Sequence, residues 1–145
     1  MSRAGWRAAP ALFAVGIALP LWADSRAVDA GAALFHARAP ATVWGLSLLV
    51  VPFLALGAWL RQPVLLAAAA LAAGGAVSNG IALAAWPQGV PDYWELAPPG
   101  LLFNGGDLVI WTGAAAALLA AAGAALDHLR RGGSLLDDAS ALRGR

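Results

Sequence analysis

The stretch of sequence that decides the fold is Pro63–Trp86, which reads PVLLAAAALAAGGAVSNGIALAAW. It contains no charged residue, and it is long enough to cross a hydrocarbon core of about 30 Å, which takes roughly 20 helical residues. Pro63 suits the first turn of a helix, where its missing N–H costs no hydrogen bond. The small residues at 74–76 and 78–80 let neighbouring helix backbones approach closely in lipid. We therefore expect a transmembrane helix here, packed tightly against its neighbours.

Three other apolar stretches accompany it. They are about Ala8–Ala23, which is short for a span, and Ala41–Leu60 and Leu108–Leu126, which are close to the required length. Hydrophobic residues make up 61% of the chain and charged residues 12%, whereas a soluble domain has about 25% charged residues. This composition predicts an all-α integral membrane protein with four transmembrane helices. One membrane domain would cover residues 1–126, and a polar tail would cover residues 127–145.

The arginines predict the orientation of these spans. Under a four-span arrangement, most of them fall on one side of the membrane: Arg3, Arg7, Arg61, Arg130, Arg131, Arg143 and Arg145. Only Arg26 and Arg38 fall on the other side, and basic residues favour the cytoplasmic side. Both termini are therefore expected in the cytoplasm. The segments Asp24–Pro40 and Pro87–Gly106 would face outward, the first as a short connection and the second as a re-entrant-like loop.

Two further features bear on the partners and the processing of the chain. The formal net charge of +1 provides no basic surface for nucleic acid. Arg3 and Arg7 flank the first apolar stretch as they would in a signal peptide, but cleavage after Ala23 would put Leu21 where a small residue is required. We therefore expect an uncleaved first span.

Two acidic residues, Asp92 and Asp107, lie at the segment between the expected third and fourth spans. Ionisable groups at membrane depth are energetically costly, and they are usually functional. Two neighbouring carboxylates in a poorly solvated site acquire different pKa values, so that one holds a proton while the other remains a base. Such a pair is the minimal equipment for acid–base hydrolysis. It makes Asp92 and Asp107 the candidate catalytic residues.

Each aspartate also has a purely structural explanation. Asp107 precedes an apolar run, where it could cap a helix and interact with the helix dipole. Asp92 follows Pro91 and could belong to an ordinary turn. Asn79 and Asn104 are expected at the same membrane surface, and a buried amide without a partner would be costly. Four polar residues converging on one surface favour a site over two unrelated structural roles.

Other common catalytic and metal-binding arrangements are not available to this sequence. It has no cysteine, and its two histidines, His36 and His128, are expected on opposite sides of the membrane. A metal pair between them is therefore excluded, and the serines lack a histidine or lysine partner for nucleophilic catalysis. We expect neither a metal nor an organic cofactor.

Several short motifs resemble those of the lipoprotein signal peptidases, also known as type II signal peptidases. Residues 74–79, GGAVSN, are similar to the family's Gly-Gly-Ala-x-Gly-Asn motif, with Ser78 in place of a glycine. Residues 89–93, GVPDY, resemble the element that carries the first catalytic aspartate. Residues 103–107, FNGGD, resemble the Phe-Asn-x-Ala-Asp element that carries the second. Residues 29–35, DAGAALF, look like the family's Asn-x-Gly-Ala-Ala-Phe element.

The resemblance implies a four-span aspartic endopeptidase of the bacterial inner membrane. Asp92 and Asp107 would be its catalytic pair, and Asn79, Asn104 and Gly31 would orient or bind the substrate. The family's substrates are diacylglyceryl-modified prolipoproteins, which are cut on the amino side of the lipidated cysteine. Membrane lipid would be the other partner, and no cofactor is implied.

Two other functions stay open at this point. The family usually carries Asp-Arg three residues after its third-span asparagine, where this chain has Ala82 and Leu83. The loss of these polar residues fits a non-catalytic relative that binds lipidated segments or a partner helix. A third interpretation is a small membrane scaffold, in which the motif matches arise partly by chance.

Overall fold

The structure is a computed structural model that describes residues 3–36, 45, 48, 51–59, 62–96 and 100–131. Its helices and strands are, in chain order, α1 (Arg3–Asp29), β1 (Leu34–His36), α3 (Val51–Trp59), α4 (Pro63–Ala85), β2 (Val90–Asp92), β3 (Trp94–Leu96), β4 (Leu101–Phe103) and α5 (Gly105–Arg130). The polar tail expected at residues 127–145 is described only as far as residue 131.

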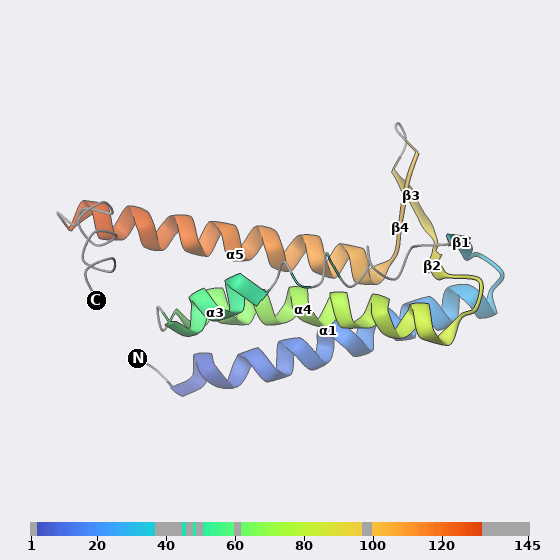
Figure 1. The fold of residues 1–145 in the computed structure, drawn as a ribbon, viewed down its shortest axis with the longest axis horizontal. Coiled ribbons are helices and arrows are strands. Elements are labelled where there is room, and N and C mark those ends of the chain that lie inside the picture. The colour runs from blue at the N-terminus through green and yellow to red at the C-terminus, as the bar shows by residue number, and fades with distance from the viewer. Residues whose placement is uncertain are drawn as a thin grey trace.

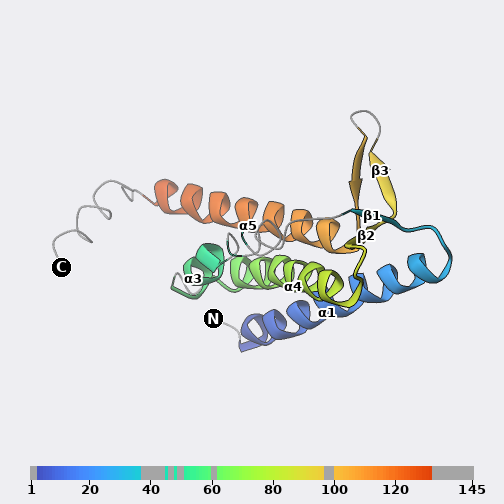
Figure 2. The same ribbon diagram turned by 45° about the vertical axis from the view of Figure 1, so that its right-hand side comes forward.

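The helices lie side by side, with α4 in the middle of the bundle (Figures 1 and 2). α4 contacts α1, α3 and α5. α1 and α4 run toward the end where the four strands gather, which we call the strand end, and α5 runs away from it. α1 therefore begins, and α5 ends, at the opposite end of the bundle.

Glycine and alanine account for the close spacing of the helices. A β-carbon placed on Gly74 of α4 would lie 2.8 Å from Cα of Gly16 in α1. One placed on Gly113 of α5 would lie 2.6 Å from the backbone nitrogen of Ala72 in α4. Backbones this close leave no room for a side chain between them, as expected for membrane helices that pack through small residues. α4 is accordingly buried along much of its length.

Three helices, α1, α4 and α5, are long and apolar enough to cross a membrane, which indicates an integral membrane protein. α4 ends one residue short of the expected span Pro63–Trp86. The expected span Ala41–Leu60 lies partly outside the described residues, and its described part consists of Gly45, Leu48 and the short helix α3.

The first span extends well beyond the apolar stretch that predicted it. α1 continues past Ala23 to Asp29, because a helical backbone satisfies its own hydrogen bonds whether or not its side chains are apolar. A Schellman motif ends the helix, in which the backbone N–H groups of Gly31 and Ala32 donate to carbonyl groups of its last turn. The polar residues just after Ala23 therefore belong to the bundle and not to an outer loop.

The last span is also longer than expected at both ends. α5 begins at Gly105, before the apolar run that starts at Leu108, and it continues past Leu126 to Arg130. Asp107 therefore lies inside the first turn of the helix. The part of the tail from residue 127 to residue 130 is helical as well.

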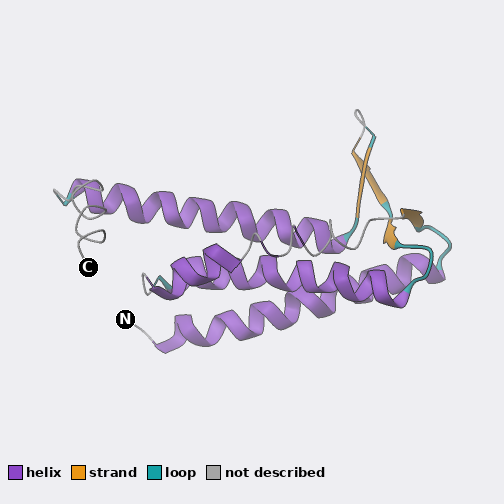
Figure 3. Ribbon diagram, in the orientation of Figure 1, coloured by secondary structure: helices purple, strands orange, loops and turns teal. Residues whose placement is uncertain are grey.

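The all-α expectation was wrong at the strand end. β1 pairs antiparallel with β2, and β3 pairs antiparallel with β4. In place of a re-entrant-like loop, the segment after α4 forms β2 and then a hairpin of β3 and β4 that projects away from the bundle (Figure 3). Pro87 and Pro91 disfavour a helix in this segment, so its backbone groups find their partners by strand pairing.

Candidate functional site

The first turn of α5 holds Asp107. Asn104 is the N-cap of this helix, and its side-chain Oδ1 accepts a hydrogen bond of 2.9 Å from the backbone N–H of Asp107. The capping role that could have explained Asp107 therefore belongs to Asn104. The Asp107 carboxylate is available for contacts with other elements.

Asn79 of α4 reaches this carboxylate. Its Nδ2 donates a 2.8 Å hydrogen bond to Asp107 Oδ1, which joins α4 to α5 at the strand end. Asn79 is 4% exposed, and a β-carbon on Gly106 would collide with its Oδ1. Only glycine at 106 therefore leaves space for Asn79 to hold the carboxylate in one orientation. The structure thus brings Asn79, Asn104 and Asp107 together, as the sequence-based grouping requires.

Asp92 is the last residue of β2. It stands opposite Leu34 of β1 in the register, and β2 packs against both α1 and α4. Asp92 is 1% exposed, and its neighbours Val90 and Pro91 are buried as well. Its surroundings are therefore those of a buried strand and not of a solvated turn, which was the structural alternative for this residue. Burying a carboxylate is costly, and this cost favours a functional reason for Asp92.

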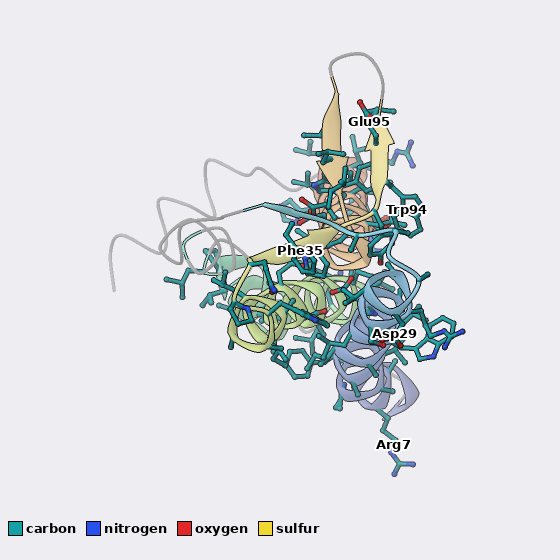
Figure 4. The ribbon with its side chains drawn as sticks, turned by 90° about the vertical axis from the view of Figure 1, so that its right-hand side faces the viewer. Arg7, Asp29, Phe35, Trp94 and Glu95 are labelled. Atoms are coloured by element: carbon teal, nitrogen blue, oxygen red, sulfur yellow. The ribbon has the colours of Figure 1, made fainter. Side chains whose placement is uncertain are left out.

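Strands β1 and β2 lie across the strand end of the bundle. Figure 4 looks onto this end, with Phe35 of β1 near its centre, Trp94 at the base of the hairpin and Glu95 farther out. Asp92 precedes the hairpin in the chain, and Asn104 and Asp107 follow it. The hairpin therefore connects the two parts of the sequence that carry the candidate catalytic residues.

Tyr93, for which the sequence predicted no role, ties these parts together. Its hydroxyl accepts a 2.9 Å hydrogen bond from the backbone N–H of Gly105, the first residue of α5. The buried carboxylate of Asp24 in α1 is close enough to act on the same hydroxyl electrostatically. Burial raises the pKa of Tyr93 above its ordinary value, and the negative charges of Asp24 and Asp107 raise it further. Tyr93 therefore stays protonated and joins α1, the strand segment and α5 at one point.

Asp24 is the second polar residue that the sequence-based reasoning missed. It is fully buried, although the apolar residues of the first span end at Ala23. Between residues 7 and 29 of α1, the buried positions are Ala9, Gly16, Pro20 and Asp24. Positions four or seven apart lie on one face of a helix, so Asp24 continues the face that packs inside the bundle. Extending this spacing past the last apolar residue would have identified it.

Gly31 and the two positions that depart from the family motif have structural explanations. Gly31 is exposed and adopts φ +66° at the end of α1, a left-handed conformation that glycine adopts without strain. Ala82 is fully buried and Leu83 is half-buried, so apolar packing occupies the places where the family carries Asp-Arg.

The two histidines lie at opposite ends of the bundle, as expected. His36 ends β1 at the strand end, and His128 lies in the last turn of α5. In the part of the chain that the structure describes, no group of three histidine or acidic side chains is arranged to hold a metal ion.

Two buried amide atoms at the strand end lack a protein partner. Within the described residues, Asn79 Oδ1 and Asn104 Nδ2 make no hydrogen bond. Leaving a buried polar group without a partner costs about 1–3 kcal/mol, so such groups need an explanation. Asn79 in turn holds the Asp107 carboxylate in a fixed orientation, which acid–base catalysis requires. The arrangement can therefore support acid–base chemistry on a bound peptide.

No protein-family model, curated protein or solved structure matches the chain. The function is therefore inferred from the residues at the strand end, their contacts and their chemistry.

Proposed function

We propose that the chain is a divergent aspartic endopeptidase of the lipoprotein signal peptidase type, with Asp92 and Asp107 as its catalytic pair. The observation that carries the proposal is that the strand end holds both a buried Asp92, in β2, and an Asp107 carboxylate to which Asn79 donates a hydrogen bond. Neither the turn explanation of Asp92 nor the capping explanation of Asp107 accounts for this arrangement. A membrane protein gains nothing from such costly groups unless they act on something.

In the proposed reaction, one carboxylate of the pair takes a proton from a water molecule, and the water attacks the scissile carbonyl. The other carboxyl group, protonated, polarises that carbonyl and then gives its proton to the leaving amine. The two groups act as a coupled pair, so the roles belong to the pair and not to either residue alone. Asn79 orients Asp107, and Asn104 fixes the start of α5 by accepting a hydrogen bond from the Asp107 N–H.

The proposed topology has four spans and both termini in the cytoplasm. α1 ends at the strand end and α4 begins at the opposite end, so the chain between them has to return along the bundle. α4 has 23 residues, and at a rise of about 1.5 Å per residue this return covers roughly 35 Å. Arg7, Arg130 and Arg131 lie at the end opposite the strands, which the positive-inside rule assigns to the cytoplasm. The site would then face the outside of a bacterial inner membrane.

This location suits a substrate that is anchored in lipid. A diacylglyceryl-modified prolipoprotein leaves the bilayer at its surface, where the strand end would meet both the peptide and water. The apolar surface of the bundle would accommodate the lipid chains, since the exposed residues of α5 include Leu108, Trp111 and Leu118. We therefore propose diacylglyceryl-modified prolipoproteins as the substrate class.

One observation favours a second candidate function, a non-catalytic relative that binds lipidated segments. Ala82 is fully buried where the resembling family carries a polar residue, and Leu83 follows it. Apolar packing at these positions removes groups that would support the catalytic pair. Such a protein would bind a lipidated peptide without cutting it.

A cleavage assay with three variants tests the proposal. The chain is reconstituted in lipid vesicles with a synthetic diacylglyceryl-modified precursor peptide, and products are followed by mass spectrometry. We expect Asp92→Asn and Asp107→Asn each to lower the cleavage rate at least about 100-fold, because asparagine can neither take nor give the catalytic proton. Asp127→Asn is the matched control, since Asp127 is exposed at the far end of α5 and pairs only with Arg131 among the ion pairs described.

Two results would overturn the proposal. If both aspartate variants cleave at the rate of the wild type, the pair is not catalytic. If the wild type binds the lipidated peptide but never cuts it, the non-catalytic function is correct. Circular dichroism of each variant separates a loss of chemistry from a loss of fold.

A further inference from the structure

The β3–β4 hairpin presents two different faces. Residues opposite each other in an antiparallel pair point to the same side, and successive residues alternate between sides. One face therefore carries Trp94 with Phe103, and Leu96 with Leu101, according to the register of the pair. The other face carries Glu95 and Leu102. The tip, residues 97–99, lies outside the described residues.

A chain of aromatic contacts shows which way the apolar face points. The ring of Trp94 lies 5.7 Å from that of Phe103, and the ring of Phe103 lies 5.2 Å from that of Trp111. Trp111 lies six residues into α5, about 9 Å from its start at the helical rise. The face that contacts Trp111 is therefore directed along α5 toward the body of the bundle. The face with Glu95 is directed away from it.

The apolar face is largely uncovered by protein. Trp94 is 43% exposed, Leu96 56% and Leu101 45%, and Trp111 next to them on α5 is 45% exposed. α5 is long and apolar enough to span a membrane, so the exposed side of Trp111 belongs to its lipid-facing surface. The hairpin face joins that surface through the contact between Phe103 and Trp111, and the hairpin itself projects from the bundle (Figure 1).

We propose that the hairpin lies on the membrane surface with its Trp94–Leu96–Leu101–Phe103 face inserted in the lipid and its Glu95 face in water. Tryptophan is favoured at this depth because its ring is apolar while its N–H reaches the polar headgroups. Phospholipid is the partner that the geometry favours. The apolar face is directed along α5 toward the interior of the membrane, where acyl chains surround that helix. A second copy of the chain is a poor alternative. Strands of three residues offer far less than the roughly 1,200 Å² that a stable protein interface buries.

Insertion of the hairpin would have a consequence for the site. β3 follows Asp92 and Tyr93 directly, and β4 is followed directly by Asn104. A hairpin held at one depth in the lipid holds both of these segments at that depth. The position of the hairpin in the membrane is independent of whether the site is catalytic.

The experiment uses the absence of cysteine from the chain. Single cysteines are introduced as Glu95→Cys and Leu96→Cys, each labelled with a nitroxide, and the full chain is placed in phosphatidylcholine–phosphatidylglycerol nanodiscs. These neighbours form a matched pair, because they share a strand and differ only in the face they occupy. We expect the label at 96 to be more accessible to oxygen, which concentrates in lipid, and the label at 95 to be more accessible to a water-soluble nickel complex. Leu101→Cys should behave like position 96.

Equal accessibility at 95 and 96 would overturn the proposal. Dipolar broadening of the label at 96 that disappears when the labelled chain is diluted with unlabelled chain would also overturn it, in favour of a contact between copies. A label that disturbs folding is recognised by circular dichroism. In that case quenching by brominated lipid is measured on wild type and on Trp94→Phe. The difference reports Trp94 alone, and no lipid quenching of that residue would refute insertion.

Discussion

Two regions of the contact between α4 and α5 are built from opposite kinds of residue. In the middle of the bundle, Gly113 meets Ala68 and Ala72 at backbone distance. At the strand end, Asn79 donates a hydrogen bond to Asp107, and the buried Asn104 accepts one from the backbone N–H of Asp107. The first region brings the helices together at little cost, whereas the second buries groups that are costly to bury. The close packing of small residues therefore stabilises the contact between the helices, and this stability offsets the cost of burying the polar groups at the strand end.

The largest expected effect comes from breaking the small-residue region. In Gly113→Leu, the new side chain would meet the Ala72 nitrogen and the Ala68 carbonyl oxygen, 2.6 and 2.7 Å from its β-carbon, so the helices must separate. We expect a loss of about 3 kcal/mol of stability, at the upper end for an overpacked core. Unfolding of the purified chain in mixed micelles, followed by circular dichroism, measures it.

Gly123→Leu is the matched control for that variant. Gly123 is in the same helix, and no atom of the described residues lies within 4 Å of a β-carbon placed there. Its stability should stay within about 0.5 kcal/mol of wild type, as for other surface substitutions. If both glycine variants behave alike, close backbone approach is not what holds α4 to α5.

A smaller effect is expected from Tyr93→Phe, which weakens the polar region. The variant leaves the Gly105 N–H without its acceptor, while the ring stays in place. Leaving this buried N–H without a partner should cost about 2 kcal/mol. Under the proposed function the cleavage rate should fall as well, because Tyr93 positions the start of α5. If the Tyr93→Phe chain has the stability and activity of the wild type, the hydrogen bond to the Tyr93 hydroxyl contributes to neither.

The stability of the folded chain at alkaline pH should report on Tyr93 without any mutation. The pKa of Tyr93 is raised in the folded chain from its ordinary value of 10.0, chiefly by burial. The stability linked to its proton is therefore fully present below pH 10 and is lost as the pH rises above it. Since Tyr93 is the only tyrosine, tyrosinate absorbance reports it alone. Absorbance that appears at the pH of free tyrosine would contradict the buried hydroxyl, and the Tyr93→Phe variant should lack the alkaline loss of stability.

The smallest effect is expected at the exposed rim of the strand end. Gly31→Ala puts a β-carbon on a residue with φ +66°, where local strain is the obstacle, since none of the described residues comes within 4 Å of that β-carbon. A cost of about 1 kcal/mol follows from the left-handed conformation. A thermal melt measures this cost, and a cleavage assay on the same sample reports whether Gly31 also contacts substrate. A large loss of cleavage at unchanged stability would give Gly31 the substrate role that the family resemblance implies.

The features that could be predicted from the sequence were local ones, which depend on residues close together in the chain. Apolar length located α4 almost to the residue, and the small residues within it predicted its close packing. Chain order placed Asn79, Asn104 and Asp107 at one surface, where the structure has them in contact. Asp24 escaped notice because hydropathy reports where apolar residues end, and a helix that packs inside a bundle continues beyond that point.

The pairing of distant segments was decided only in three dimensions. Leu34–His36 pairs with Val90–Asp92. The Tyr93 hydroxyl accepts a hydrogen bond from the first N–H of α5 and is affected by the charge of Asp24. None of these partners is a neighbour in sequence. Composition and spacing determined that this chain would form membrane helices with acidic residues at one end. The helices pack closely at their glycines, and this packing decides which of those residues are in contact. A hydrogen bond forms only between groups within about 3 Å of each other, and such proximity is a property of the packed bundle and not of the chain.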